Sequence, residues 1–261
     1  MSLSARISAL ALLLPALLIG QPLRAQVAEQ RDSSSFLARE LIVPGVLIGS
    51  GMGIHWLAHE SIDIPVQEAA QRWRARSGPV PYYNYTFKYI PALPLVMDAG
   101  LGLVGVPAEH GFLDRCIEAT LATGLVSVVD LMLKGVIDAP RPDGTENDSF
   151  PSGHCCIAFV GAELVRMEYG WGWGAGAYAV ATTVAVLRSY HNRHYLSDLL
   201  TGAGMGILSA HVGRWLLEPT KRLFQIPTYD WGSGRPAVQV SFAPSVDPYS
   251  GTICAGLAMS F

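Results

Sequence analysis

Charged residues are scarce in this chain. Asp, Glu, Lys and Arg make up 15% of its 261 residues, whereas ordinary soluble domains carry about 25%. The formal net charge is −3, so the chain lacks the concentrated basic surface that binding to nucleic acid normally requires. Half of the residues are hydrophobic, and together with the shortage of charge this favours a membrane-embedded body or a very apolar helical bundle.

Cysteine is also rare, and its placement excludes a metal or disulfide framework. The four cysteines lie at positions 116, 155, 156 and 254, and this spacing matches no common metal site. Cys155 and Cys156 are neighbours in an apolar segment. We therefore expect both of them to pack as small apolar side chains.

The N-terminal segment has the form of an export signal. Arg6 precedes an apolar run from Ile7 to Gly20, and Ala25-Gln26 is a plausible cleavage point. The run is shorter than the roughly twenty residues that a membrane-spanning helix needs. We expect residues 1–25 to be a signal peptide, with an uncleaved anchor as the alternative.

Apolar stretches of about helix length fill the middle of the chain. They cover residues 41–58, 89–106, 112–133, 155–165, 174–187 and 199–217. Glycine and alanine are frequent inside them, and such small residues let membrane helices approach closely. The fold class predicted for residues 26–225 is therefore all-α, a membrane-embedded bundle of about five to six long helices.

Two segments differ from these helices. Ile62 to Arg76 alternates apolar and basic positions, as in an amphipathic helix that lies on lipid headgroups; a plain surface helix fits equally well. In the tail, residues 226–261, two alternating runs from Ala237 to Phe242 and from Thr252 to Phe261 flank a proline-containing turn. They predict a small C-terminal β-hairpin.

Three short motifs between positions 134 and 198 carry the candidate chemistry. They read KGVIDAPRP, PSGH and RSYHNRHYLSD. The candidate site residues within them are three cations, two histidines and one carboxylate: Lys134, Arg141, Arg188, His154, His194 and Asp198. Several cations in an apolar setting are costly to bury without an anionic partner, so the motifs predict a site for a multiply charged anion such as phosphate.

In this order and spacing, the motifs resemble those of the type 2 phosphatidic acid phosphatase (PAP2) superfamily, whose pattern is K-x6-RP, PSGH and SR-x5-H-x3-D. One position departs from the pattern, because Leu187 stands where the family has a serine before the arginine. Every charged position of the pattern is filled. The resemblance covers about Ile90 to Leu217 and implies a PAP2-type helical bundle.

The resemblance also implies a phosphatase that needs no metal or cofactor and forms a phosphohistidine. His194 would attack phosphorus, Asp198 would orient it, and His154 would protonate the leaving oxygen. The phosphate oxygens would be held by Lys134, Arg141, Ser152, Gly153 and Arg188. The spacing itself supports one of these roles, since His194 and Asp198 are four apart and share a helix face. A carboxylate on one imidazole nitrogen fixes the tautomer and raises the basicity of the other.

The expected substrate is a lipid-linked phosphate, with lipid A 4′-phosphate as the first choice. Undecaprenyl diphosphate, phosphatidylglycerol phosphate and phosphatidic acid are the next candidates. Three different functions also stay open: a broad-specificity exported acid phosphatase, a vanadium haloperoxidase and a non-enzymatic envelope protein. The expected location is the bacterial inner membrane with the site facing the periplasm, or an exported periplasmic protein. The expected partners are the substrate and membrane lipid, with no obligate protein partner and no nucleic acid.

The export signal and the number of spans conflict. A cleaved signal places the mature N-terminus outside, and six complete spans would then put the loop from Arg141 to His154 inside. In the membrane branch of the family this loop faces outward. Three solutions stay open: the stretch from Leu41 to Ala58 does not cross, the first segment is retained, or the exported chain only leans on a bilayer.

The remaining histidines and several charged residues are expected to have ordinary structural roles. Capping or packing is predicted for His55, His59, His110, His191 and His211. Interfacial anchoring is predicted for Arg166 and Arg193. Solvated turn positions are predicted for Asp143, Glu146 and Asp148; a second reading is that these carboxylates repel an additional phosphate on the substrate.

Overall fold

The computed structural model describes residues 33–78, 89–229, 239–246 and 253–260. The segment expected to be a signal peptide lies outside the described residues. The elements, in chain order, are α2 Ser33–Leu57, the π-helix η2 His59–Asp63, α3 Ile64–Ser77, the 3-10 helix η3 Ile90–Ala92, α5 Leu93–Leu103, α6 Phe112–Val136, α7 Gly153–Tyr190, α8 Leu196–Phe224, β1 Gln239–Val246 and β2 Ile253–Ser260.

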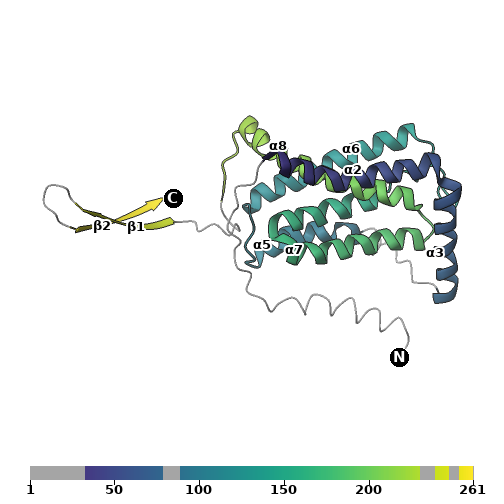
Figure 1. The fold of residues 1–261 in the computed structure, drawn as a ribbon, viewed down its shortest axis with the longest axis horizontal. Helices are drawn as coiled ribbons and strands as arrows, with labels where there is room; N and C mark the ends of the chain where they lie inside the picture. The colour runs from purple at the N-terminus through teal and green to yellow at the C-terminus, as the bar shows by residue number, and fades with distance from the viewer. Residues whose placement is uncertain (1–32, 79–88, 230–238, 247–252, 261) are drawn as a thin grey trace, which may run out of the picture.

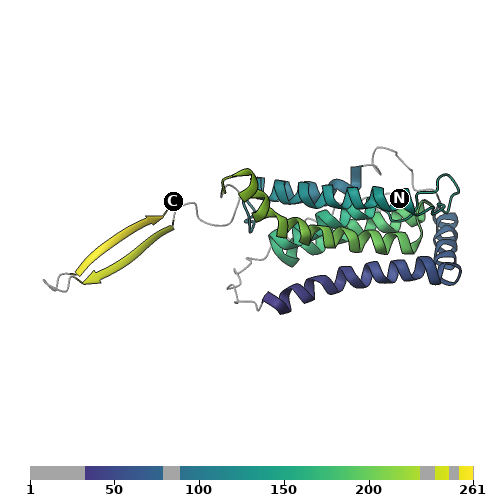
Figure 2. The ribbon, with the colours of Figure 1, turned by 90° about the horizontal axis from the view of Figure 1, so that it is seen from above.

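The long helices form a bundle, and a short helix covers one of its ends. Figures 1 and 2 show α2, α6, α7 and α8 running side by side, with α3 lying across the end at which α2 stops. Gln67 of α3 donates hydrogen bonds to the carbonyl oxygen of Ser189 (3.0 Å) and to the side chain of Asn192 (2.6 Å), just where α7 ends. We call this end of the bundle the site end, and the other the far end.

Helix α7 consists of two antiparallel arms. Gly170 has φ 76° and ψ −177°, a backbone conformation that a glycine adopts without steric cost. The Tyr178 hydroxyl donates to the Glu163 carboxylate (2.6 Å) across the arms. The prediction of two separate helices here is therefore confirmed, and the start of the first arm and the end of the second meet at the site end.

The core lies where α6, both arms of α7 and α8 touch. Cys155 and Cys156 are buried free thiols within it, as their apolar surroundings predicted. Gly206 of α8 faces the backbone of the first α7 arm so closely that a Cβ there would meet the carbonyl oxygen of Cys156. This close approach explains why small residues are frequent in the apolar stretches.

Two helices have the length and composition of membrane spans: Glu40–Leu57 in α2 and Phe112–Val136, which is α6. Both are mostly unburied within the bundle, and α6 turns Leu131, Met132 and Val136 outward, with 70%, 65% and 85% of each exposed. Such surfaces suggest that the bundle associates with a membrane. Every element of the described residues up to Phe224 is a helix, so the all-α fold class predicted for residues 26–225 is confirmed there.

The two strands at the C-terminal end pair antiparallel, with Gln239 opposite Ser260 and Val246 opposite Ile253. They fall on the two alternating runs of the tail. The hairpin nevertheless stays a prediction, as do the domain boundaries at residues 25 and 225.

Candidate active site

Four helix ends bring the three motifs together at the site end. Helix α6 ends just after Lys134, and the second arm of α7 ends just after Arg188. The first arm of α7 begins at Gly153, and α8 begins at Leu196 with Asp198 in its first turn. Since these helices run antiparallel, motifs far apart in the sequence meet at one end of the bundle.

His194 is held in a single tautomer by the loop before the second motif. Its side chain is almost fully buried, and its Nδ1 lies 2.9 Å from the carbonyl oxygen of Ser149. A ring nitrogen that faces a carbonyl oxygen carries the proton, so Nδ1 is the donor. Nε2 therefore keeps its lone pair, and it lies 3.1 Å from Nη2 of Arg188.

Asp198 contributes less directly to this tautomer than the sequence suggests. Its Oδ2 is 3.5 Å from Nδ1 of His194, beyond the 3.2 Å of a good hydrogen bond. The same oxygen accepts from the backbone N–H of Tyr195 (2.9 Å) and from the Ser149 hydroxyl. Asp198 thus fixes the start of α8 and the Ser149 loop, while the Ser149 carbonyl holds the imidazole.

Burial and the neighbouring cations depress the basicity of both histidines. Burial, followed by the charge of Arg188, lowers the pKa of His154 to about 3, with Lys134 and Arg141 adding to the effect. Burial is also the main cause that lowers the pKa of His194, and the nearby Asp198 carboxylate opposes this effect. Both imidazoles are therefore neutral near pH 7, and a bound phosphate dianion would raise their pKa values again.

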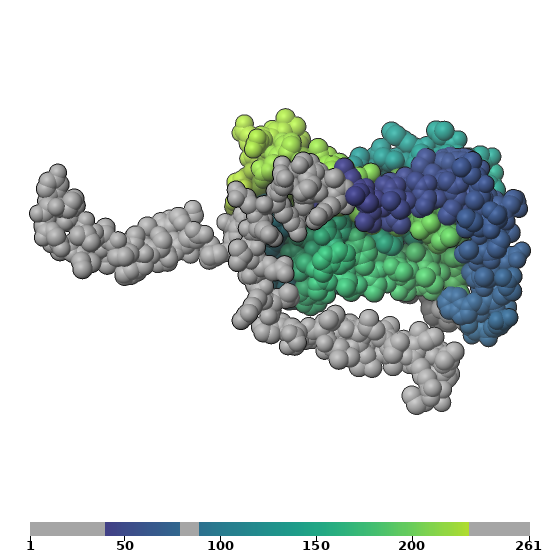
Figure 3. Space-filling model, in the orientation of Figure 1, coloured from purple at the N-terminus to yellow at the C-terminus, as the bar shows by residue number. Residues whose placement is uncertain are grey.

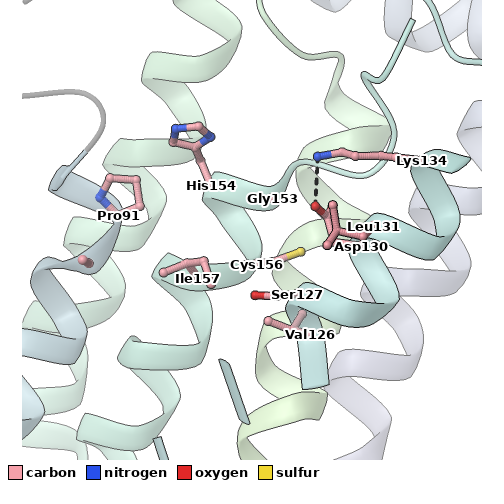
Figure 4. A pocket seen from close by; sticks show the side chains of 11 residues that line it. Pro91, Val126, Ser127, Asp130, Leu131, Lys134, Gly153, His154, Cys156 and Ile157 are labelled. Carbon is pink, nitrogen blue, oxygen red and sulfur yellow. Dashed lines mark hydrogen bonds and ion pairs between the residues drawn. The ribbon is translucent and has the colours of Figure 1, made fainter. Parts of the chain in front are cut away.

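Lys134 and Gly153 line the opening of the site. Nζ of Lys134 pairs with Oδ2 of Asp130 (2.9 Å), as the dashed line in Figure 4 shows. A Cβ on Gly153 would lie 3.0 Å from that carboxylate oxygen and 3.4 Å from Nζ. Glycine therefore leaves room for an anion beside the lysine at the start of the first α7 arm, where the helix dipole also favours negative charge.

Ser152 is fully buried, and its backbone N–H donates to the carbonyl oxygen of Asp198 (3.1 Å). This bond ties the second motif to the third.

Arg141 belongs to a compact loop with its own acidic partners. Its Nε lies 2.7 Å from Asp148 and its Nη2 lies 3.1 Å from Glu146. These two carboxylates remain 41% and 56% exposed, and the hydrogen bond from Arg141 lowers the pKa of Asp148. The expectation of simple solvated turn residues is thus incomplete, because both carboxylates pair with a predicted phosphate ligand.

Arg193 and Arg166 each pair with a carboxylate of the protein. Nη1 of Arg193 lies 2.7 Å from Asp143 and also donates to Thr145, which links the third motif to the loop of the first. Nη2 of Arg166 pairs with Glu163 at 2.6 Å inside the bundle. Each guanidinium thus has a carboxylate partner within the protein, and the interfacial anchoring expected for both residues stays a prediction.

A cavity of about 420 Å³ opens from the motifs between η3, α6 and the first α7 arm (Figure 4). Its polar end contains Lys134, His154 and Asp130, and its walls are otherwise mostly apolar. The apolar part is lined by Pro91, Ala92, Val126, Leu131, Cys156 and Ile157. A cavity with Lys134 and His154 at one end and mostly apolar walls beyond them suits an amphiphilic phosphate.

The structure therefore gathers all eight predicted site residues at one end of the bundle, while their individual roles remain predictions. Sequence reasoning missed Ser149 and Asp130. Nothing about Ser149 in the sequence could have identified it, because its carbonyl group does the work. Asp130 was detectable, since it lies one helical turn before Lys134.

Comparison with known proteins points to one family. Residues 116–222 match the family model described as the PAP2 superfamily. Over 92 residues the chain is 41% identical to a lipid A 1-phosphatase of Porphyromonas gingivalis, a match that covers 34% of this chain and 20% of that protein. The similarity thus spans about one fifth of the relative's length.

Two solved structures are similar in part. A crystal structure of Aquifex aeolicus LpxE has a TM-score of 0.46 at 19% identity, over 59% of this chain and 94% of the other. A transmembrane PAP2-type phosphatidylglycerolphosphate phosphatase from Bacillus subtilis has a TM-score of 0.47 at 22% identity, over 72% and 97%. At these TM-scores the likeness alone does not establish a common fold.

Proposed function

Since residues 116–222 match the model of the PAP2 superfamily, we propose that the chain is a phosphatase of this type and removes phosphate from a lipid-linked phosphate ester. The observation that carries the proposal is the contact of 3.1 Å between Nε2 of His194 and Nη2 of Arg188. A nucleophile beside a guanidinium is suited to attack a phosphorus whose oxygens that guanidinium binds.

The proposed reaction has two steps. Nε2 of His194 attacks phosphorus and the bond to the leaving oxygen breaks, while protonated His154 gives that oxygen its proton. Neutral His154 then takes a proton from water, the water oxygen attacks phosphorus, and the P–N bond breaks. Lys134, Arg141 and Arg188 offset the negative charge of the phosphoryl oxygens throughout, so the residues present supply the charge stabilisation themselves.

The depressed pKa of His154 is compatible with its role as an acid. The cations that lower this pKa to about 3 are the same groups that would bind phosphate. A phosphate dianion brings two negative charges into their midst, and an opposite charge within about 4–6 Å favours a protonated imidazole. Substrate binding would therefore load His154 with the proton that the leaving oxygen needs.

A lipid substrate is supported by the apolar cavity next to the motifs. Val126, Leu131 and Ile157 form part of its wall, and α6, which carries two of them, is one of the two helices suited to cross a membrane. A hydrocarbon chain could lie along this wall while its phosphate reaches Lys134. A water-soluble phosphate ester would leave this apolar surface without a partner.

Lipid A is the first candidate among such lipids. The relative that shares 41% identity over 92 residues carries the name lipid A 1-phosphatase, whereas the sequence alone suggested the 4′-phosphate. Both are terminal phosphate groups on a glucosamine ring, so the cation cluster could bind either one. Undecaprenyl diphosphate and phosphatidylglycerol phosphate remain second candidates, since they offer the same terminal phosphate.

The proposed location is the inner membrane with the site facing the periplasm. Helix α2 starts at the far end and stops at the site end (Figure 1). If α2 crosses the membrane, its start and the site therefore lie on opposite sides. A periplasmic site then needs residues before α2 on the cytoplasmic side, which is incompatible with signal cleavage just ahead of a spanning α2.

The test is phosphate release by the purified protein in detergent. The substrates are lipid A, undecaprenyl diphosphate, phosphatidylglycerol phosphate, phosphatidic acid and p-nitrophenyl phosphate, and mass spectrometry of the lipid A product identifies the phosphate removed. We expect the protein to release phosphate preferentially from one lipid. This activity should persist in EDTA and be inhibited by vanadate. Equal turnover of p-nitrophenyl phosphate would favour an exported acid phosphatase, and no release from any substrate would refute the proposal.

A further inference from the structure

A second histidine–aspartate pair lies next to the pair of the third motif, at the start of α8. His59 and Asp63 are four residues apart, as are His194 and Asp198. The first pair occupies the π-helix η2 between α2 and α3. Turns of π-helix are rare in proteins overall, but those that occur are often found at functional sites. Nδ1 of His59 lies 3.0 Å from Oδ2 of Asp63.

Asp63 binds the first turn of α8. Its side chain is fully buried, and it accepts hydrogen bonds from the backbone N–H of Ser197 (2.9 Å) and from the Ser197 hydroxyl (2.6 Å). Ser197 lies 134 residues away in the sequence and immediately precedes Asp198. The first N–H groups of a helix have no partner within it, and here a carboxylate from a distant segment supplies one.

The surrounding contacts leave this turn little freedom. The rings of His59 and Tyr195 meet edge to face with centroids 4.7 Å apart. Gly51 of α2 lies so close to α8 that a Cβ on it would clash with Thr201 and approach the carbonyl oxygen of Ser197 to 2.8 Å. The segment from α2 to η2 thus packs closely against the first turn of α8, which carries Asp198.

We propose that Asp63, supported by His59, is a positioning residue for phosphoryl transfer. It holds Ser197, and through Ser197 the turn in which Asp198 meets the His194 loop. Asp63 lies outside the phosphate contacts and acts only through α8. The inference rests on the proposed function, because the geometry that Asp63 protects matters only if His194 attacks phosphorus.

A positioning role and a merely stabilising role have different kinetic consequences. The cations Lys134 and Arg141 come from α6 and the loop after it, so they do not depend on the Asp63 contact. Loosening the α8 turn should therefore lower kcat while KM stays nearly constant. Misplacing a reacting group by about 1 Å can reduce the rate about 100-fold, whereas a structural contact would affect only stability.

The experiment compares Asp63→Asn, Asp63→Ala and Ser197→Ala with Glu60→Gln as the control. Glu60 is an exposed carboxylate in the same π-helix, so Glu60→Gln makes the same chemical change as Asp63→Asn outside the contact. Asn keeps one acceptor and Ala keeps none, while Ser197→Ala removes only the hydroxyl bond. We expect kcat losses of about 10-fold for Asp63→Asn and Ser197→Ala and about 100-fold for Asp63→Ala, with KM and the control unchanged.

Hydrogen exchange of the Ser197 amide provides a readout that does not require turnover. It should be slow in the wild type and in Glu60→Gln, and faster in Asp63→Asn and Asp63→Ala. Wild-type kcat in the folded Asp63→Asn and Ser197→Ala proteins, beside an inactive His194→Ala protein, would overturn the inference and leave the proposed function standing. If the wild type releases no phosphate, the proposed function fails. If the exchange rate of the Ser197 amide is the same in Asp63→Asn as in the wild type, the inference that Asp63 holds Ser197 fails as well.

Discussion

Both ends of the helical bundle contain an arginine held by two carboxylates, but the two pairs of carboxylates differ in their exposure to solvent. At the far end Arg214 contacts Glu118 and Glu168, whose side chains are each 1% exposed. At the site end Arg141 contacts Asp148 and Glu146, which are 41% and 56% exposed. Enclosed pairs cannot exchange partners without unfolding, whereas a solvent-facing carboxylate can give way to a phosphate.

The far end also shows how similar ligand sets can serve different purposes. His110, Glu118 and Glu168 bring three potential metal-ligating atoms within 4.8 Å of one another. The guanidinium of Arg214 contacts both glutamates and supplies the positive charge that such a cluster requires. Here the cation belongs to the protein and the cluster joins α6, α7 and α8, while at the site end the exposed carboxylate partners of Arg141 can give way to an anion from outside.

Replacement of Arg214 by alanine should give the largest change in stability. It leaves Glu118 and Glu168 buried without their cation, and breaking a buried pair by removing one partner costs about 3–5 kcal/mol. The thermal unfolding midpoint in detergent should fall clearly, while kcat of the folded fraction stays near that of the wild type. A loss of kcat in a protein with unchanged thermal stability would contradict the division between the two ends.

Arg214→Ala combined with Glu168→Gln is the control for this change. Removing a carboxylate together with the arginine reduces the uncompensated negative charge, so the double variant should be more stable than Arg214→Ala alone.

Asp148→Asn should change the binding of phosphate slightly and leave stability almost unchanged, unlike Arg214→Ala. The solvent-facing pair contributes little to folding, so thermal stability should hardly change. Arg141 loses a competing carboxylate, and inorganic phosphate should inhibit more strongly, by at most about fivefold. Because the pKa of Asp148 is lowered by Arg141, the carboxylate stays charged through neutral pH. The difference from the wild type should therefore vanish only in acid, as the pH falls through that lowered pKa.

The inhibition constant of phosphate tests this effect when it is measured from neutral pH down to acid below the ordinary aspartate pKa of 3.8. Glu109→Gln is a matched control at the far end, since Glu109 is another exposed carboxylate that pairs with an arginine, Arg214. Equal inhibition of Asp148→Asn and the wild type at neutral pH would show that Asp148 does not compete with phosphate for Arg141.

The sequence predicted the site better than it predicted what supports it. Lys134, His154 and His194 were found because their motifs have a characteristic spacing, and the helices were found because apolar stretches predict them. Asp63 was missed, although His59-x3-Asp63 repeats the spacing of His194-x3-Asp198. Its role depends on a contact 134 residues away, which spacing alone cannot reveal.

Arg193 illustrates the same limit from the other side. Interfacial anchoring was predicted for Arg193, and nothing in the spacing indicated its partner Asp143, which lies 50 residues earlier in the chain. Local patterns predict which segments are helical and which residues are chemically capable. They do not predict the pairing of surface charges between loops, because that pairing is decided by how the helices assemble.

The most direct test of the account is to identify the phosphorylated residue. The purified protein would be mixed with its preferred substrate carrying ³²P in the scissile phosphate and quenched in alkali within milliseconds, and the labelled peptide would be sequenced. We expect label that is stable in alkali and labile in acid, located on His194 and missing from His194→Ala. Label on any other residue, or its persistence in His194→Ala, would contradict the assignment of His194 as the nucleophile.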